Sequence, residues 1–299
     1  MSLEPTKKET PWLLPDCSSQ HMPAGLYLVA TPIGNLGDIT VRALDMLSRA
    51  DYIVCEDSRV TKKLLSAYGV KGVLGRYHDH SGEDDRADIC ERIEQGQRVV
   101  MVSDAGMPLV SDPGYQLVRS CLEKGLRVSS APGANAPLMA LQLSGLPSHA
   151  FSFIGFLPNK MQARRRFLER WRDVPSSVIA FESAGRLVKT LGDIADVMGG
   201  EREVAVVREM TKLHEEMWRG SAGEMAAFYK AQGAPKGEIV IVIAPVDAEQ
   251  SDDEASCRAL LREAMAEHKM KDAVKMISVK TGVASAVLYE WALEIQNEC

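Results

Sequence analysis

Short apolar segments alternate with helical stretches through the first half of the chain, and this alternation constrains the fold more than any other feature. Each apolar, β-rich segment is followed by residues whose apolar positions recur at helical spacing. The strand-like segments are 26–30, 52–55, 99–102 and 127–130, and the helical stretches end near 48, 65, 124 and 143. Strands and helices in this order predict an α/β fold with a mainly parallel sheet that is buried on both faces.

Three loops rich in glycine, proline and small polar residues follow strands of this predicted sheet. They read TPIGNLGD at 31–38, SDAGMPLVSDPG at 103–114 and APGANA at 131–136. In open α/β folds, ligands bind at the carboxyl ends of the strands. Loops of this composition let the backbone approach a ligand closely. We therefore expect a ligand site there, with three ordinary turns as the alternative.

The first loop lacks the spacing of a phosphate-binding loop. A dinucleotide fingerprint needs glycines in the order G-x-G-x-x-G, whereas this loop has only Gly34 and Gly37, and no Lys-Ser or Lys-Thr pair follows. Asp38 stands where the next helix should begin. Its carboxylate would cap that helix and would repel a phosphate placed there.

The second half of the chain predicts further domains. Strand-like segments recur at 177–183, 203–210 and 237–245, among helical stretches such as RRRFLERW. The acidic, apolar-poor segment VDAEQSDDEAS is typical of a linker. We divide the chain into a disordered tail (1–24), an N-terminal α/β domain (25–147), a second α/β domain (148–245), a linker (246–256) and a helical module (257–299).

The helical module has the pattern of a helix-turn-helix. Gly282 separates two short helices, and the turn of this motif usually contains a glycine. From position 255 on, six basic residues are matched by six acidic ones. A DNA reader normally has a clear basic excess, so we favour an RNA-docking or packing role over promoter binding.

Composition limits the class of protein. The net charge of −6 over 299 residues argues against a protein that coats nucleic acid without selectivity. The six cysteines form no C-x-x-C pair, so we expect reduced thiols and neither a zinc site nor a disulfide framework. No apolar run reaches the length of a membrane span, and the N-terminal segment is polar and broken by prolines. These features predict a cytoplasmic protein.

Five longer motifs occur between about residues 25 and 245. They read LYLVATPIGNLGDITVRALDMLSRADYIVCEDSR, VVMVSDAGMPLVSDPG, SSAPGANAPLMAL, FESAGR and REMTKLHEE. In this order they resemble the tetrapyrrole methylase superfamily, and more narrowly its ribosomal RNA small-subunit methyltransferase I branch, which methylates a cytidine ribose 2′-hydroxyl in 16S rRNA. The resemblance implies two α/β domains with S-adenosylmethionine in the cleft between them, usually in a homodimer. Macrocycle methylases usually carry G-x-G-P-G-D in the first loop; here the proline precedes the glycines, which favours the ribosomal branch.

The resemblance also implies a set of cofactor-binding residues. Asp104 would accept hydrogen bonds from the hydroxyls or the amino group of the cofactor, although capping its own turn is the alternative. Phe181 would offer an apolar face to the adenine, although it could equally be a core residue. The full set is Pro32, Asp104, Ala105, Gly106, Met107, Asn135, Ala136, Phe181 and Gly237.

Proton removal from a ribose hydroxyl calls for a carboxylate, a histidine or a lysine. We prefer Glu182 and Lys212 as catalytic residues because each follows a strand of the second domain; surface ion pairs are the alternative. Other candidates are Glu56, Asp57, His78, His80, His214 and Glu215. No motif for a catalytic metal is present.

Arginines supply the candidate RNA contacts, because guanidinium is planar and binds phosphate in a bidentate manner. We expect this role for Arg59, Arg164, Arg165 and Arg166, with a solvated helix face as the alternative for the last three. Two other functions stay open: a methyltransferase that acts on a tetrapyrrole or another small substrate, and a non-catalytic nucleic-acid-binding protein.

Overall fold

A computed structural model describes residues 21–78, 81–233, 235–246, 254–281, 283 and 285–297. The chain divides into two compact units, and one short segment of the later chain belongs to the first: Met1–Ala136 with Met210–His214, and Pro137–Glu209 with Glu215–Cys299. Most of the predicted disordered tail and of the predicted linker lies outside the described residues. No helix among the residues described has the length and apolarity needed to cross a membrane.

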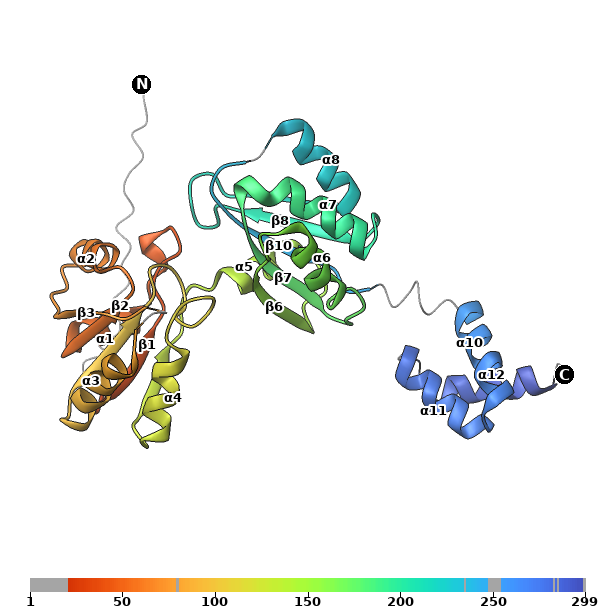
Figure 1. Ribbon diagram of the computed structural model, residues 1–299, viewed down its shortest axis with the longest axis horizontal. Helices are drawn as coiled ribbons and strands as arrows, with labels where there is room; N and C mark the ends of the chain where they lie inside the picture. Colours follow the sequence, from red (N-terminus) through yellow and green to blue (C-terminus); the bar gives the residue numbers. More distant parts are fainter. Residues whose placement is uncertain are drawn as a thin grey trace, which may run out of the picture. The chain divides into compact units, whose positions relative to one another are not determined.

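The first unit contains a five-stranded sheet, of which Figure 1 labels β1, β2 and β3. The strand order is β3-β2-β4-β1-β5. All its pairings are parallel, as the alternation of strands and helices predicts. The strands are β1 (Gly25–Val29), β2 (Tyr52–Cys55), β3 (Leu74–Arg76), β4 (Arg98–Val102) and β5 (Val128–Ala131). The helices are α1 (Val41–Arg49), α2 (Ser58–Ala67), α3 (Glu83–Glu94), α4 (Tyr115–Glu123) and α5 (Ala136–Ser144), the last of which runs into the second unit.

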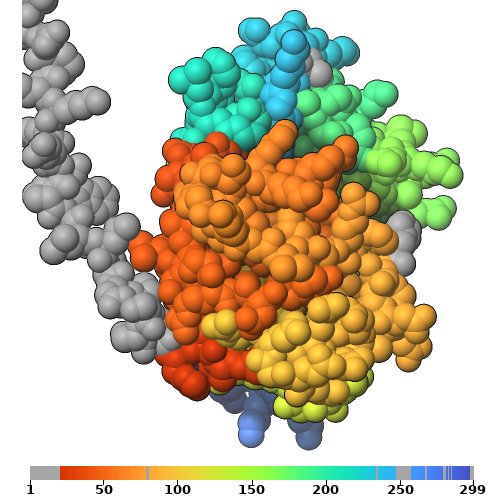
Figure 2. All heavy atoms as spheres, turned by 90° about the vertical axis from the view of Figure 1, so that its left-hand side faces the viewer, coloured from red at the N-terminus to blue at the C-terminus, as the bar shows by residue number. Residues whose placement is uncertain are grey.

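Both faces of this sheet are apolar because successive residues of a strand point to opposite sides. In β1, Tyr27 and Val29 pack with residues of α1 and α2, whereas Leu26 packs with residues of α3 and α4. Helices therefore cover both faces of this sheet. Figure 2 looks onto this unit from the side of β3.

The start of α1 differs from the prediction. Asp38 ends a short 3-10 helix, η1 (Leu36–Asp38), and does not cap α1. The Asn35 side chain accepts the Gly37 N–H, and the Thr40 hydroxyl accepts the Ala43 N–H at 3.1 Å. The prediction was wrong by two residues because two side chains that can cap helices stand close together in this segment.

The second unit contains a mixed five-stranded sheet of order β6-β7-β10-β8-β9. Only β6 and β7 pair in parallel; the other three pairings are antiparallel. The strands are β6 (Phe151–Phe156), β7 (Ser177–Ser183), β8 (Glu203–Arg208), β9 (Glu216–Ser221) and β10 (Glu238–Ile243). The helices are α6 (Met161–Glu169), η2 (Ala184–Arg186), α7 (Leu187–Met198) and α8 (Ala222–Gln232), and α6, α7 and α8 share one apolar core with the sheet.

Three helices form the C-terminal module: α10 (Glu254–Glu267), α11 (Met270–Thr281) and α12 (Ser285–Asn297). They enclose a small core of their own, which includes Leu261, Val274 and Leu288. This agrees with the helical module expected from the apolar spacing.

Candidate functional site

The first two glycine-rich loops are joined by a backbone bridge. Thr31 and Gly106 exchange both N–H···O=C hydrogen bonds, at 2.8 and 3.0 Å. Gly106 has φ of 81°, which only glycine adopts without strain, and a Cβ there would lie 3.1 Å from the Ile33 side chain. The turn after β4 is thus held against the turn after β1, as expected for loops at one edge of a parallel sheet.

The third loop meets the other two. The Asn135 amide lies 3.7 Å from the Met107 sulfur of the second loop, and the hydroxyl of Thr40, which caps α1 directly after the first loop, lies 3.5 Å from the Pro132 carbonyl oxygen. We call the residues of 31–38, 103–114 and 131–136 the loop cluster. The three loops therefore converge.

Asp104 connects the loop cluster to the end of β2. One of its carboxylate oxygens accepts the backbone N–H of Asp57 at 3.1 Å, and its side chain is only partly buried. The second carboxylate oxygen gives this residue further capacity to accept a hydrogen bond. Asp57 is itself bound by Arg59, and the hydrogen bonds from that guanidinium hold the pKa of the Asp57 carboxyl well below its usual range.

Backbone strain occurs in the second loop and in the turn that follows β8. Among the residues that the structure describes, four other than glycine have positive φ: Leu109, Ser111, Glu209 and Thr211. Two of them lie in the second loop, and two lie at the turn that follows β8. Strain of this kind is found most often at functional sites, where the surrounding structure imposes the conformation.

Lys212 lies against the first loop. A methyl group on Gly34 would stand 2.5 Å from Cγ and 2.8 Å from Cε of Lys212, so the lysine stem packs directly on this glycine. The segment Met210–His214 belongs to the first unit, although it follows β8 in the chain. The contact therefore brings one of the two predicted catalytic residues to the loop that contains Pro32, which is buried.

The other members of the predicted cofactor set have varied surroundings. Ala105 is exposed, and Asn135 and Ala136 are half-buried. In the second unit, Phe181 is half-buried and its ring centroid lies 4.9 Å from that of Phe153 and 5.2 Å from that of Phe156. Gly237 has φ of 102° and lies against the Glu209 side chain.

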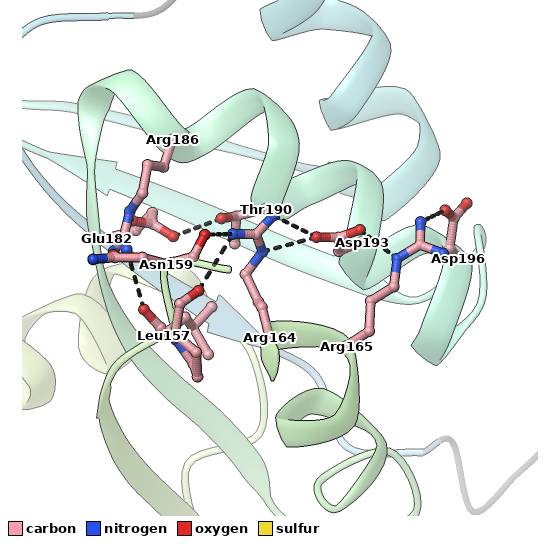
Figure 3. Close-up of polar contacts among 10 residues, drawn as sticks. Leu157, Asn159, Arg164, Arg165, Glu182, Arg186, Thr190, Asp193 and Asp196 are labelled. Atoms are coloured by element: carbon pink, nitrogen blue, oxygen red, sulfur yellow. Dashed lines mark hydrogen bonds and ion pairs between the residues drawn. The ribbon is translucent and has the colours of Figure 1, made fainter. Parts of the chain in front are cut away.

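Glu182 is enclosed, which does not favour the predicted role of general base. Its side chain has no exposed surface and forms an ion pair with Arg186, Nη2 to Oε1, at 2.5 Å. The Thr190 hydroxyl donates to Oε2 at 2.5 Å (Figure 3), and the Ser183 N–H donates to Oε1 at 2.6 Å. A carboxylate that is already bound through both oxygens is poorly placed to accept a substrate proton, so we do not propose it as a base.

The predicted RNA-binding arginines fall into two groups. Arg59 is 82% exposed and Arg166 is exposed. Arg164, in contrast, is only 3% exposed and pairs with Asp193, and the half-exposed Arg165 pairs with Asp193 and Asp196. Burial removes Arg164 from the candidate phosphate contacts, because its guanidinium faces the protein interior.

Three further observations concern the predicted chemistry. His80, one of the alternative bases, lies outside the described residues. No group of three or more His, Cys, Asp or Glu side chains is placed to hold a metal ion within the part of the chain that the structure describes. The Asp104–Asp57 contact was not predicted, although both residues follow strands of the parallel sheet.

The architecture, with a parallel sheet whose carboxyl-edge loops converge and a mixed sheet in the second unit, is that of a two-domain methylase. The family described as Tetrapyrrole (Corrin/Porphyrin) Methylases matches residues 25–226, and the RsmI C-terminal HTH domain matches residues 251–296. Among solved structures, the complex of uroporphyrin-III C-methyl transferase from Thermus thermophilus with S-adenyl homocysteine is similar. Its TM-score is 0.52 at 19% identity, over 74% of this chain and 97% of that one, so the likeness concerns the fold alone.

Relatives with assigned names show to which family within the tetrapyrrole methylases the chain belongs. A protein of Erythrobacter litoralis named ribosomal RNA small subunit methyltransferase I is 46% identical, over 94% of this chain and 99% of the relative. A protein of the same name from Mesorhizobium japonicum is 45% identical, over 91% and 92%. The chain belongs to the tetrapyrrole methylase family and, within it, to the ribosomal RNA small subunit methyltransferase I family.

Proposed function

We propose that this chain transfers a methyl group from S-adenosylmethionine to the ribose 2′-hydroxyl of a cytidine in 16S rRNA of the small ribosomal subunit. The observation that carries this proposal is identity above 40%, over more than nine-tenths of the chain, with relatives named as methyltransferases of that RNA. The RNA substrate is inferred from those names, and the cytidine from the resemblance of the sequence motifs.

The loop cluster has the chemistry that the cofactor requires. A nucleoside with an amino-acid tail needs acceptors for its hydroxyls, backbone groups for its polar edges and apolar contacts for its base. Asp104 supplies the carboxylate, and Thr31 and Gly106 bring two turns of backbone together beside it. Half-buried Met107 and Asn135 add an apolar and an amide group. We assign the cofactor to these residues together with Pro32, Ala105 and Ala136.

Phe181 and Gly237 stay proposals for the same cofactor from the second unit. Phe181 is half-buried in a cluster of three phenylalanine rings. Such a cluster presents a rigid apolar surface, which suits a flat base.

The bound cofactor supplies an electrophilic methyl group on a sulfonium, and the protein must align a ribose oxygen with it and accept the proton of that hydroxyl. Alignment alone can contribute several kcal/mol. We assign Lys212 to the reacting hydroxyl, because its stem lies on the first loop of the cluster. An ammonium there would orient the hydroxyl and stabilise the developing alkoxide, and a neutral amine would accept its proton.

Exposed arginines supply the contacts to phosphate. Arg59 follows the end of β2, close in sequence to Asp57 and so to Asp104, and Arg166 lies on α6. Arg165 is half-exposed, but its guanidinium already pairs with two aspartates, Asp193 and Asp196. We therefore expect it to contribute less to phosphate binding than Arg59 and Arg166. We further propose a cytoplasmic homodimer, as the resemblance implies.

Incubation of the protein with labelled S-adenosylmethionine tests the proposal. Small ribosomal subunits, naked 16S rRNA and a tetrapyrrole would be offered in parallel. We expect label in the RNA, in a dinucleotide that resists alkali, because alkaline cleavage needs a free 2′-hydroxyl. Label in the macrocycle, in an alkali-labile nucleotide or in none of the substrates would contradict the proposal.

A further inference from the structure

Two arginines bind the backbone of the turn between β6 and α6. Arg186 donates from Nη1 to the Leu157 carbonyl oxygen at 3.2 Å. Arg164 donates from Nη1 to the carbonyl oxygens of Pro158 and Asn159, at 3.3 and 3.2 Å (Figure 3). Three consecutive carbonyls of the turn are thus bound by guanidinium groups.

Each of these arginines is itself fixed by a buried carboxylate. Arg186 pairs with Glu182, and Arg164 pairs with Asp193; both carboxylates are at most 5% exposed. Burying charges in this way carries a large desolvation cost, which is offset only by close pairing and additional hydrogen bonds. Two such pairs on one short turn indicate that the backbone of the turn must keep a defined conformation.

The turn itself presents side chains to solvent. The Phe156 ring is 60% exposed although it contacts Phe181, and Asn159 and Lys160 are exposed. Exposed aromatic rings and cationic side chains are the groups with which proteins hold single-stranded nucleic acid, since a base stacks on the ring and a phosphate pairs with the cation, and this turn carries one of each. A loop held by a rigid scaffold is also where binding residues are commonly found.

We propose that the turn Phe156–Lys160 is a contact surface for substrate RNA, with a base stacked on Phe156 and a phosphate at Lys160. Arg164 and Arg186 are positioning residues, which act on the RNA only through the backbone that they hold. This inference rests on the proposed function in one respect, namely that RNA is the substrate. The residues that it names do not include Lys212, to which the methyl-transfer chemistry is assigned.

The chain offers a matched pair for the test. Phe151 begins β6 and Phe156 ends it, and both are exposed phenylalanines. With small ribosomal subunits as substrate, we expect F156A to raise the KM for the subunits about tenfold, because stacking on an aromatic ring contributes that order of affinity. F156Y, which keeps a ring against Phe181, should restore the KM. F151A should leave KM within a factor of two. Equal effects of F156A and F151A, or none from F156A, would overturn the proposal.

The positioning role of Arg186 is tested by a separate variant, R186K. R186K keeps a positive charge for Glu182 but cannot reach the Leu157 carbonyl with a second nitrogen, so we expect a rise in KM without a fall in the affinity for S-adenosylhomocysteine measured by calorimetry. Circular dichroism and unfolding by urea check that the variant folds. A folded R186K with wild-type KM would contradict this role.

Crosslinking separates this proposal from the proposed function. A photoreactive benzoyl-phenylalanine at position 156, in the full chain mixed with small subunits, should crosslink to RNA, whereas the same group at 151 should not. Crosslinks to RNA from 156 would support the surface even if no methyl transfer were detected. Crosslinks only to protein, including a second copy of this chain, or no crosslinks, would overturn the surface even if methyl transfer proceeded.

Discussion

Nη2 of Arg164 lies 2.5 Å from Oδ2 of Asp193, and both side chains are almost wholly buried. The second oxygen of the same carboxylate accepts Nε of Arg165 at 2.6 Å. Asp193 therefore binds two adjacent arginines of α6 from its place on α7. It fixes these two helices to each other, next to the turn for which we propose an RNA contact.

Replacement of Asp193 by alanine should destabilise the protein by about 3–5 kcal/mol, because the buried Arg164 would lose its counter-charge. D193N should lower the free energy of unfolding less than D193A does, since an amide oxygen can still accept one hydrogen bond. Unfolding by urea, followed by tryptophan fluorescence, measures both losses.

Asp196 supplies the control for that comparison. It pairs with Arg165 but is 60% exposed, and exposed pairs contribute little. D196N should therefore change the free energy of unfolding by less than about 1 kcal/mol. If D196N lowered the free energy of unfolding as much as D193A does, burial would not set the strength of these aspartate–arginine pairs.

The sequence predicts the elements whose pattern is repeated and long. The central strands of the first sheet carry continuous apolar runs between helices of clear spacing, and they were predicted within a residue or two. β3 was missed because three residues, LGR, are too few to show a period. α3 was missed because most of its residues are charged and its apolar positions are few.

The candidate site was predictable only in part. Parallel topology brings strand ends together, so the convergence of the three loops could be anticipated. Glu182 and Arg186 stand four residues apart, a spacing that could have suggested their ion pair. Arg164 and Asp193 are 29 residues apart, and no local pattern indicates that Arg164 turns inward while Arg166 faces solvent.

D104N should weaken the binding of S-adenosylhomocysteine about 10- to 100-fold, which is the effect of losing a charged acceptor in a hydrogen bond. The amide oxygen of the asparagine can still accept the Asp57 N–H, so the loop should keep its structure. Isothermal calorimetry measures the affinity.

Asp51 is the matched control, because it precedes β2 and pairs with Arg98 at the opposite end of the strand. D51N should bind the ligand as the wild type does. If D104N also bound with wild-type affinity, Asp104 would not belong to the cofactor site.

G34A should lower kcat about tenfold or more, because the added methyl group would displace the Lys212 stem. K212M should lower kcat as well, and the double variant should lose little beyond K212M, since both changes act on the same contact. Initial rates on small subunits give these values. G192A, where the added methyl group would meet no atom within 4 Å apart from the adjacent backbone of its own helix, should keep the wild-type kcat. Additive losses in the double variant would mean that Gly34 acts independently of Lys212.

Alkaline pH should destabilise the protein through Cys121. Burial beside Cys90 raises the pKa of this thiol from 9.0 to about 12, so between these values the unfolded chain releases a proton that the folded chain retains. Stability is then complete below pH 9 and falls as the pH rises, by up to about 1.4 kcal/mol per pH unit. C121A should flatten this slope in urea unfolding measured from pH 8 to 10.5. Tyr229, whose pKa burial raises from 10.0 to about 12, gives a contrast, because Y229F should flatten the curve only above pH 10. Parallel curves for C121A and the wild type would exclude the thiol as the source of the slope.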